Sequence, residues 1–179
     1  NRLQVGYIGS FFKGNGYGLI PEMALKMPEI DFHIVGGKEP ILSQLKRGNK
    51  LINLKFYGHI PHKDLIKIYN RMDVMLAPYQ NDLPHMKWVS PMKIFEYMSY
   101  KKAIIASDFP VIREVLNEEN SILVEPDNID AWIDSIEKLK AKKIREQLSE
   151  NGFKLFLNKY TWNKRAKEII EIYEKNRNE

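Results

Sequence analysis

The sequence predicts an α/β fold in which a parallel sheet is covered by helices on both faces. Six short apolar segments, each suited to one strand, recur along the chain, and segments with helical periodicity separate them. The first of these strands runs into a glycine-bearing loop, and a helical pattern follows that loop. Strands that alternate with helices in this way form parallel sheets that are buried on both faces.

The predicted elements account for most of the chain. Strands are expected at residues 3–8, 32–35, 53–57, 73–77, 103–106 and 121–124. Helices are expected at residues 19–27, 41–46, 65–72, 90–98, 111–116, 129–139, 153–157 and 162–173. Pro78 ends the fourth strand, because proline cannot continue a central strand. Beyond Pro126 the pattern is wholly helical, and no internal repeat is visible.

The composition is that of one globular domain. Of 179 residues, 44% are hydrophobic and 28% are charged, which is enough to build a core. The net charge is +5, and the densest basic group lies within a helical pattern at 138–145, so a nucleic-acid partner is not favoured. The sequence has no cysteine, which excludes disulfides and thiolate chemistry.

No apolar run approaches the roughly 20 residues that cross a bilayer, and no signal-peptide pattern opens the chain. We therefore expect a cytoplasmic setting. The first residue is Asn1 rather than methionine, and a strand pattern begins almost at once at Leu3. We expect a single domain over 1–179, excised from a longer two-domain chain, with C-terminal helices at 150–179.

The segment 90–98 has the features of a helix whose N-terminus binds an anion. Ser90 can cap a free backbone N–H, and Pro91 suits the first helical position, so the helix is expected to begin at Ser90. The helix dipole favours an anion such as a phosphate there. Lys93 and Glu96 lie three residues apart on one side, a cation beside an acceptor for paired hydroxyls. The competing interpretation is a solvated ion pair between these two residues.

The predicted sheet places several loops at one edge. In parallel sheets the ligand lies outside the carboxyl ends of the strands, near the point where strand order reverses. The first glycine loop, the turn at Gly58 and the helix tip at Ser90 should therefore meet in one crevice. This arrangement favours a nucleotide over the ion-pair interpretation.

Several segments carry a family resemblance. They are Tyr7-Ile8-Gly9-Ser10 with Lys13-Gly14, Phe32-His33-Ile34-Val35-Gly36-Gly37, Leu54-Lys55-Phe56-Tyr57-Gly58-His59-Ile60, Asp73-Val74-Met75-Leu76-Ala77-Pro78, Ser90-Pro91-Met92-Lys93 with Glu96-Tyr97-Met98, Ala103-Ile104-Ile105-Ala106-Ser107-Asp108 and Asn120-Ser121-Ile122-Leu123-Val124-Glu125-Pro126. In this order and spacing they resemble the C-terminal domain of group 1, family 4, glycosyltransferases of GT-B fold. The resemblance covers essentially the whole chain.

This resemblance implies a Rossmann-like parallel six-stranded sheet that binds the donor of a retaining glycosyltransferase. No metal and no cofactor are implied. The donor is a UDP- or GDP-linked sugar, and a glycan or lipid-linked acceptor is brought by an N-terminal domain. By resemblance, Glu96 binds the ribose hydroxyls, Lys13 and Gly9 meet the diphosphate, and the turn at His59 and Ile60 meets the base. Lys13 and Glu96 are the expected catalytic residues, and the donor-binding set is Gly9, Ser10, Lys13, His59, Ile60, Ser90, Met92, Lys93 and Glu96.

The sequence departs from the family pattern at two positions. Trp88 stands where the family carries the first glutamate of its paired-glutamate motif, eight residues before the second. Ser10 stands where many members carry a phosphate-binding arginine, so Lys13 and Lys93 are left to neutralise the diphosphate. Trp88 and Trp162 are expected to pack in the interior, although Trp88 could also line the sugar pocket.

Two other functions are compatible with these patterns. One is a half-domain of a sugar-nucleotide epimerase, and the other is a non-catalytic Rossmann-like interaction module with an empty crevice. His59 and His62 have the spacing of metal ligands, but no third ligand completes a set, so a metal site is not expected. Surface polysaccharide biosynthesis, and peripheral membrane association of the full-length enzyme at the inner face, are expectations from the family alone.

Overall fold

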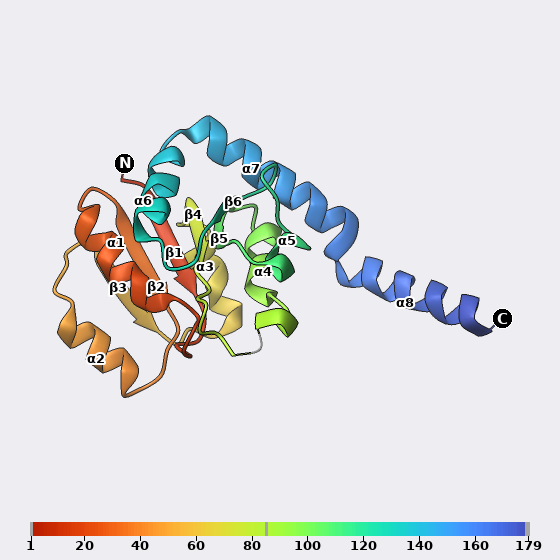
Figure 1. Cartoon of the computed structure of the whole chain (residues 1–179), viewed down its shortest axis with the longest axis horizontal. Coiled ribbons are helices and arrows are strands. Elements are labelled where there is room, and N and C mark those ends of the chain that lie inside the picture. The colour runs from red at the N-terminus through yellow and green to blue at the C-terminus, as the bar shows by residue number, and fades with distance from the viewer. Residues whose placement is uncertain (1, 85, 178–179) are drawn as a thin grey trace.

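The computed structural model describes residues 2–84 and 86–177, and within them it contains one six-stranded parallel sheet. The strand order is β3-β2-β1-β4-β5-β6, and each neighbouring pair runs parallel (Figure 1). The strands are β1 Gln4–Ile8, β2 Asp31–Val35, β3 Leu54–Gly58, β4 Val74–Ala77, β5 Ala103–Ser107 and β6 Ile122–Val124. The predicted fold class and all six strands are confirmed.

The strand order has one reversal, between β1 and β4. The chain builds β1, β2 and β3 outward in one direction, and then returns to place β4 on the other side of β1. Every residue of β4 and β5 is buried, as expected for apolar strands that are covered on both faces. The reversal therefore places a ligand-binding crevice at the carboxyl ends of β1 and β4.

Helices cover both faces of the sheet and form two hydrophobic clusters. The α-helices are α1 Ile20–Lys26, α2 Ile41–Gly48, α3 Leu65–Tyr69, α4 Met92–Ser99, α5 Pro110–Arg113, α6 Ile129–Lys138, α7 Lys142–Leu155 and α8 Trp162–Arg177. One cluster is built on α1, α2 and α6, with Met23 and Trp132 fully buried. The other is built on α3, α4 and α5, with Tyr69 and Tyr97 fully buried.

The C-terminal helices differ from the prediction in where they begin. Helix α7 starts at Lys142 rather than near residue 150, because Leu148 joins the first cluster while Leu155 packs against the second. The helix thus crosses the edge of the sheet and joins its two faces. A π-helical turn, Phe156–Tyr160, then leads into α8.

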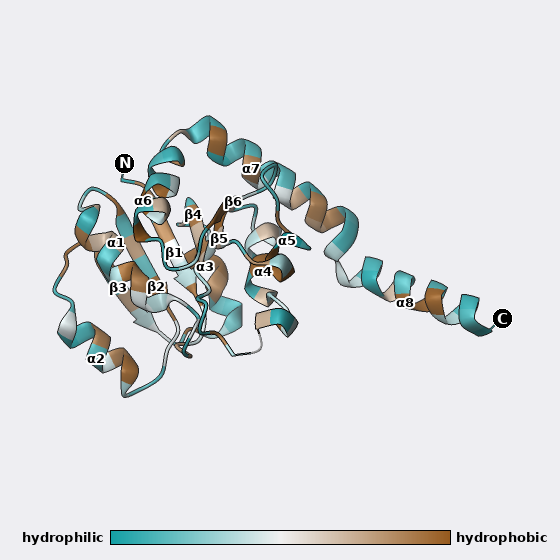
Figure 2. Ribbon diagram, in the orientation of Figure 1, coloured by the Kyte–Doolittle hydropathy of each residue, from teal (hydrophilic) through white to brown (hydrophobic). Residues whose placement is uncertain are grey.

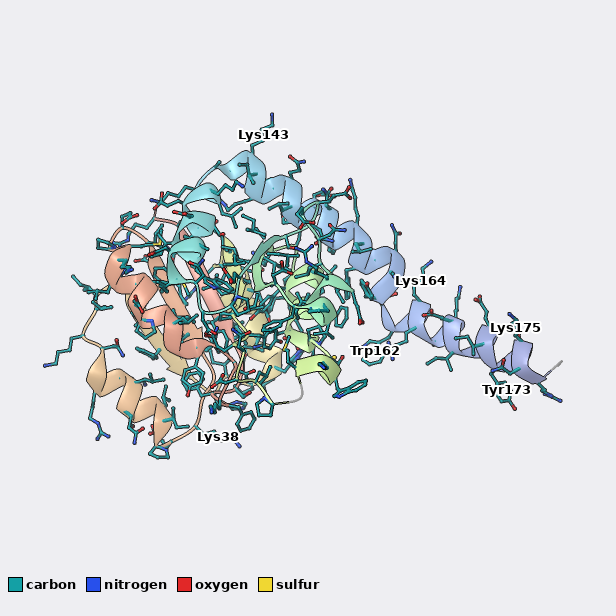
Figure 3. The ribbon with its side chains drawn as sticks, in the orientation of Figure 1. Lys38, Lys143, Trp162, Lys164, Tyr173 and Lys175 are labelled. Carbon is teal, nitrogen blue, oxygen red and sulfur yellow. The ribbon has the colours of Figure 1, made fainter. Side chains whose placement is uncertain are left out.

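Helix α8 extends away from the body of the domain (Figure 1). It carries both polar and apolar segments along its length, and its labelled side chains point into solvent (Figures 2 and 3). Trp162 is 78% exposed and Trp88 is 84% exposed, so the prediction that both pack in the interior is wrong. Across the described part of the chain, no helix has the length and apolar character needed to cross a membrane.

Candidate functional site

A cavity of about 490 Å³ lies at the carboxyl ends of β1, β2 and β3. Four of the predicted site residues line it, namely Gly9, Ser10, His59 and Ile60. The rest of its wall is largely apolar and comes from the loops after β1 and β2 and from the start of α3. The first glycine loop and the turn at Gly58 therefore meet in one crevice, as the strand pattern predicts.

The loops that form this cavity are packed backbone to backbone. The Gly9 N–H donates to the Val35 carbonyl at 3.0 Å, and the Gly36 N–H donates to the Gly58 carbonyl at 2.7 Å. Gly36 has a φ of +115°, and a Cβ atom at this position would lie 2.0 Å from the Gly9 carbonyl oxygen. Only glycine allows this approach, so Gly36 holds the first loop in place at the mouth of the cavity.

Helix α4 begins two residues later than predicted, and Ser90 does not cap it. The helix starts at Met92, and the exposed Ser90 hydroxyl donates to Met92 Sδ at 3.9 Å. Pro91 has φ −81° and ψ 65°, the conformation of an inverse γ-turn, so the Ser90 carbonyl accepts the Met92 N–H at 2.8 Å. The main chain thus takes the place of the expected side-chain cap. Ser90 and the half-exposed Met92 lie outside the set of residues that line the cavity.

The Lys93 side chain extends beneath the first loop, where its Nζ is buried although the residue as a whole is only half-buried. Its Nζ lies 4.7 Å from the centre of the Tyr7 ring and 4.6 Å from that of Tyr79. It also lies 3.1 Å from where a Gly9 Cβ would stand, and it has no hydrogen-bond partner among the residues that the structure describes. Burial lowers the pKa of the ammonium to about 8, and the Glu96 carboxylate opposes this shift.

The interpretation of Lys93 and Glu96 as a solvated ion pair is therefore wrong, because the Lys93 Nζ is buried and forms no ion pair within residues 2–84 and 86–177. Two aromatic faces attract the cation but supply no negative charge. An anion that approached Gly9 from the cavity would meet a cation already in position.

Glu96 lies at the border of the cavity. Tyr69 Oη donates to Glu96 Oε2 at 2.9 Å, and His62 Nε2, from a residue that lines the cavity, lies 3.8 Å from Glu96 Oε1. The Glu96 side chain is 35% exposed, and no hydrogen bond to Oε1 is formed within the described part of the chain. The contact with His62 connects the carboxylate to the cavity that Gly9 lines, and its predicted ribose-binding role stays a prediction.

Lys13 lies apart from these residues. It lines a second cavity of about 510 Å³, formed where the first loop meets the loop after β4. Its side chain is 78% exposed, and Nζ lies 3.5 Å from Asp82 Oδ2. The structure thus brings together Gly9, Ser10, His59, Ile60, Lys93 and Glu96, and leaves Lys13, Ser90 and Met92 outside this group.

The sequence patterns did not indicate three tyrosines that organise the site. Tyr7 and Tyr79 hold the Lys93 ammonium, and Tyr69 binds Glu96. The sequence places Tyr7 in the strand expected at 3–8 and Tyr69 in the helix expected at 65–72. One feature of the sequence could have indicated their role, because the hydroxyl of a buried tyrosine needs a hydrogen-bond partner.

Histidine, aspartate and glutamate do not assemble into a metal-binding group anywhere in residues 2–84 and 86–177. His59 and His62 both line the cavity, and Glu96 approaches only His62.

The fold and the cavity define a class of protein, an α/β domain with a cavity at the carboxyl ends of its parallel strands, the edge at which such sheets bind ligands. The family described as "Glycosyl transferases group 1" matches residues 2–142. The chain therefore belongs to the group 1 glycosyltransferases, as its sequence motifs indicated. A search of curated protein sequences gave no match.

Solved structures share this fold. Sucrose-phosphate synthase from Thermosynechococcus elongatus is 22% identical with a TM-score of 0.82, and the match covers 98% of this chain and 45% of that protein. Anabaena HepE in complex with UDP-glucose is 15% identical with a TM-score of 0.82, over 98% of this chain and 49% of HepE.

The C-terminal domain of the group 1 glycosyltransferase LpcC from Francisella tularensis is 22% identical with a TM-score of 0.71, over 89% of this chain and 87% of that domain. The sheet is thus that of the C-terminal half of a GT-B fold. The chain spans less than half the length of sucrose-phosphate synthase and of HepE.

Proposed function

We propose that the chain is the donor-binding domain of a retaining, metal-independent glycosyltransferase. It moves a sugar from a UDP- or GDP-linked donor to a glycan or lipid-linked acceptor, in the cytoplasm or at the inner face of the membrane. The observation that carries this proposal is the buried Lys93 ammonium, which lies against Gly9 without an anionic partner. A diphosphate bound at Gly9 supplies the missing negative charge.

The other residues of the site fit the remaining parts of such a donor. The largely apolar cavity between Phe12, His59 and Ile60 accommodates the base. Oε1 of Glu96 accepts hydrogen bonds from the ribose hydroxyls. Crystal structures of HepE hold UDP and UDP-glucose, which supports a nucleotide-sugar donor for this fold.

The proposed chemistry is stabilisation of a leaving group. In glycosyl transfer the nucleoside diphosphate departs with growing negative charge, and without a metal that charge is met by fixed cations and dipoles. Lys93 is one such cation. Lys13 lines the neighbouring cavity, so in this proposal it reaches the diphosphate only by leaving its exposed pair with Asp82, a pair worth only about 0–1 kcal/mol.

The acceptor and its activation come from outside this chain in our proposal, since relatives of this fold are about twice as long. We expect the chain alone to bind nucleotide but to transfer little or no sugar. A radiolabelled transfer assay on this chain and on a two-domain protein that contains it measures this difference. Rapid transfer by the chain alone would contradict the assignment.

We expect Glu96→Ala to weaken UDP binding at least about tenfold, because two hydroxyls lose their charged acceptor. Isothermal titration with UDP measures this loss of affinity. The same titration of the wild-type protein, once in the presence of EDTA and once in the presence of Mg²⁺, tests metal independence. Glu146→Ala is the matched control, because Glu146 lies on α7 and pairs only along its own helix with Lys142. Equal affinity of Glu96→Ala and wild type would contradict the ribose-binding role, and a strict need for Mg²⁺ would contradict metal independence.

A further inference from the structure

The Glu96 carboxylate is held by a tyrosine that lies behind it, away from the cavity. Tyr69, on α3, donates its hydroxyl to Oε2 at 2.9 Å, and the residue is fully buried. Its ring stacks on Tyr100 with centroids 4.1 Å apart and an interplanar angle of 13°. The hydroxyl therefore has little freedom to leave the carboxylate.

Tyr69 is in turn connected to the strand that carries the first loop. Its ring meets the Tyr97 ring edge to face, with centroids 6.1 Å apart. Tyr97 Oη accepts the Ile8 N–H at 3.2 Å and lies within donating distance of the Ile8 and Leu76 carbonyls, at 3.2 and 3.3 Å. Ile8 immediately precedes Gly9, so the tyrosines relate the position of the carboxylate to that of the loop.

The Tyr69 hydroxyl keeps the proton that it donates to Glu96. The pKa of the Tyr69 hydroxyl is raised above its ordinary value, mainly by burial and to a smaller extent by the charge of Glu96. The hydroxyl thus remains a donor, and it occupies one lone pair of Oε2. Oε1 and the remaining lone pair of Oε2 are left to accept hydroxyl groups from the cavity side.

We infer that Tyr69 is a positioning residue for ribose recognition, which fixes the Glu96 carboxylate in the orientation that accepts the two vicinal hydroxyls of a ribonucleoside diphosphate. This inference rests on the proposed function. A free glutamate side chain samples several rotamers, and immobilising it on binding costs affinity. The Tyr69 hydroxyl lowers this cost in advance, so its effect is confined to ligands that carry the hydroxyls.

The test compares UDP with 2′,3′-dideoxy-UDP by isothermal titration on four proteins. These are wild type, Tyr69→Phe, Tyr100→Phe and Glu96→Ala. We expect wild type to prefer UDP, and Glu96→Ala to lose this preference. We expect Tyr69→Phe to bind UDP about three- to tenfold more weakly while its affinity for the dideoxy analogue stays unchanged. Tyr100→Phe removes a hydroxyl from the stacked ring but keeps the Tyr69–Glu96 hydrogen bond, so it should behave as wild type.

The outcomes separate this inference from the function on which it rests. If Tyr69→Phe keeps the wild-type preference for UDP over the dideoxy analogue, or binds both ligands more weakly by the same factor, the positioning role is wrong while the donor site stands. If wild type binds neither ligand, or binds both equally, the proposed ribose contact fails and the inference fails with it. Tyr69→Met keeps an apolar side chain without the hydroxyl, and it carries the same prediction should Tyr69→Phe fail to fold.

Discussion

Lys93→Met is expected to make the protein more stable and to weaken UDP binding about 100-fold. Burial of the ammonium, which brings its pKa to about 8, costs the fold about 3 kcal/mol. Attraction to the faces of Tyr7 and Tyr79 offsets about 1–2 kcal/mol of this cost. Methionine is comparably long and uncharged, so we expect a net gain of about 1–2 kcal/mol in the free energy of unfolding. The bound diphosphate loses its buried cation, and affinity falls accordingly.

The gain in stability should depend on pH. Because the pKa of Lys93 is lower in the folded protein than its ordinary 10.5, the unfolded chain binds more protons between about pH 8 and 10.5. The free energy of unfolding of the wild type therefore rises relative to that of Lys93→Met across this window. The variant is more stable than the wild type by the full amount below pH 8, and this difference disappears near pH 10.5. Thermal unfolding of both proteins at pH 7 and at pH 10 measures this difference in stability.

Lys67→Met is the matched control, because Lys67 is 78% exposed and pairs only with Asp64 on the surface. We expect it to change neither stability nor UDP affinity appreciably. A Lys93→Met variant that binds UDP as wild type does would show that the ammonium does not meet the ligand. A loss of stability at pH 7 would show that its burial is not unfavourable.

Gly36→Ala is expected to destabilise the fold by about 3 kcal/mol or more and to abolish UDP binding. An alanine Cβ would lie 2.0 Å from the Gly9 carbonyl oxygen, and the φ of +115° is itself unfavourable for alanine. The clash is relieved when the loops after β1 and β2 move apart, which disturbs the packing that holds Gly9 at the mouth of the cavity. Urea unfolding gives the loss of stability, and titration of the folded variant gives the loss of binding.

Gly18→Ala provides the control, because a Cβ there meets no atom within 4 Å and Gly18 does not have a positive φ. We expect a change within about 0.5 kcal/mol. If Gly36→Ala is as stable as Gly18→Ala, the close packing of the loops after β1 and β2 is not what holds the site.

The sheet and its functional edge could be predicted because they follow from short-range patterns. Apolar runs such as 103–106 mark buried strands whatever their neighbours are, and a parallel order places their carboxyl ends at one edge. The strand order itself comes from long-range packing. Hence the convergence of Gly9, His59 and Ile60 was expected, whereas the separate location of Lys13 was not.

The start of α4 and the environment of Lys93 could not be predicted. The pair Ser90-Pro91 suits a capped helix, but the γ-turn at Pro91 lets a main-chain carbonyl replace the hydroxyl. Lys93 was placed correctly three residues before Glu96, yet its burial depends on Tyr7 and Tyr79, which are distant in sequence. Helical spacing predicts the face of the helix on which a side chain lies, but not which residues pack against that face.

The central claim is that the cavity at the carboxyl ends of β1, β2 and β3 binds a nucleoside diphosphate. Thermal unfolding of the wild-type protein with the diphosphates of uridine, guanosine and adenosine tests it directly, because a ligand that binds only the folded state raises the melting temperature. We predict a saturable rise of several degrees with at least one of them, corresponding to about 2.7 kcal/mol at a concentration 100-fold above Kd, and a loss of this rise in Lys93→Met. An unchanged melting temperature with all three at millimolar concentration would contradict the account.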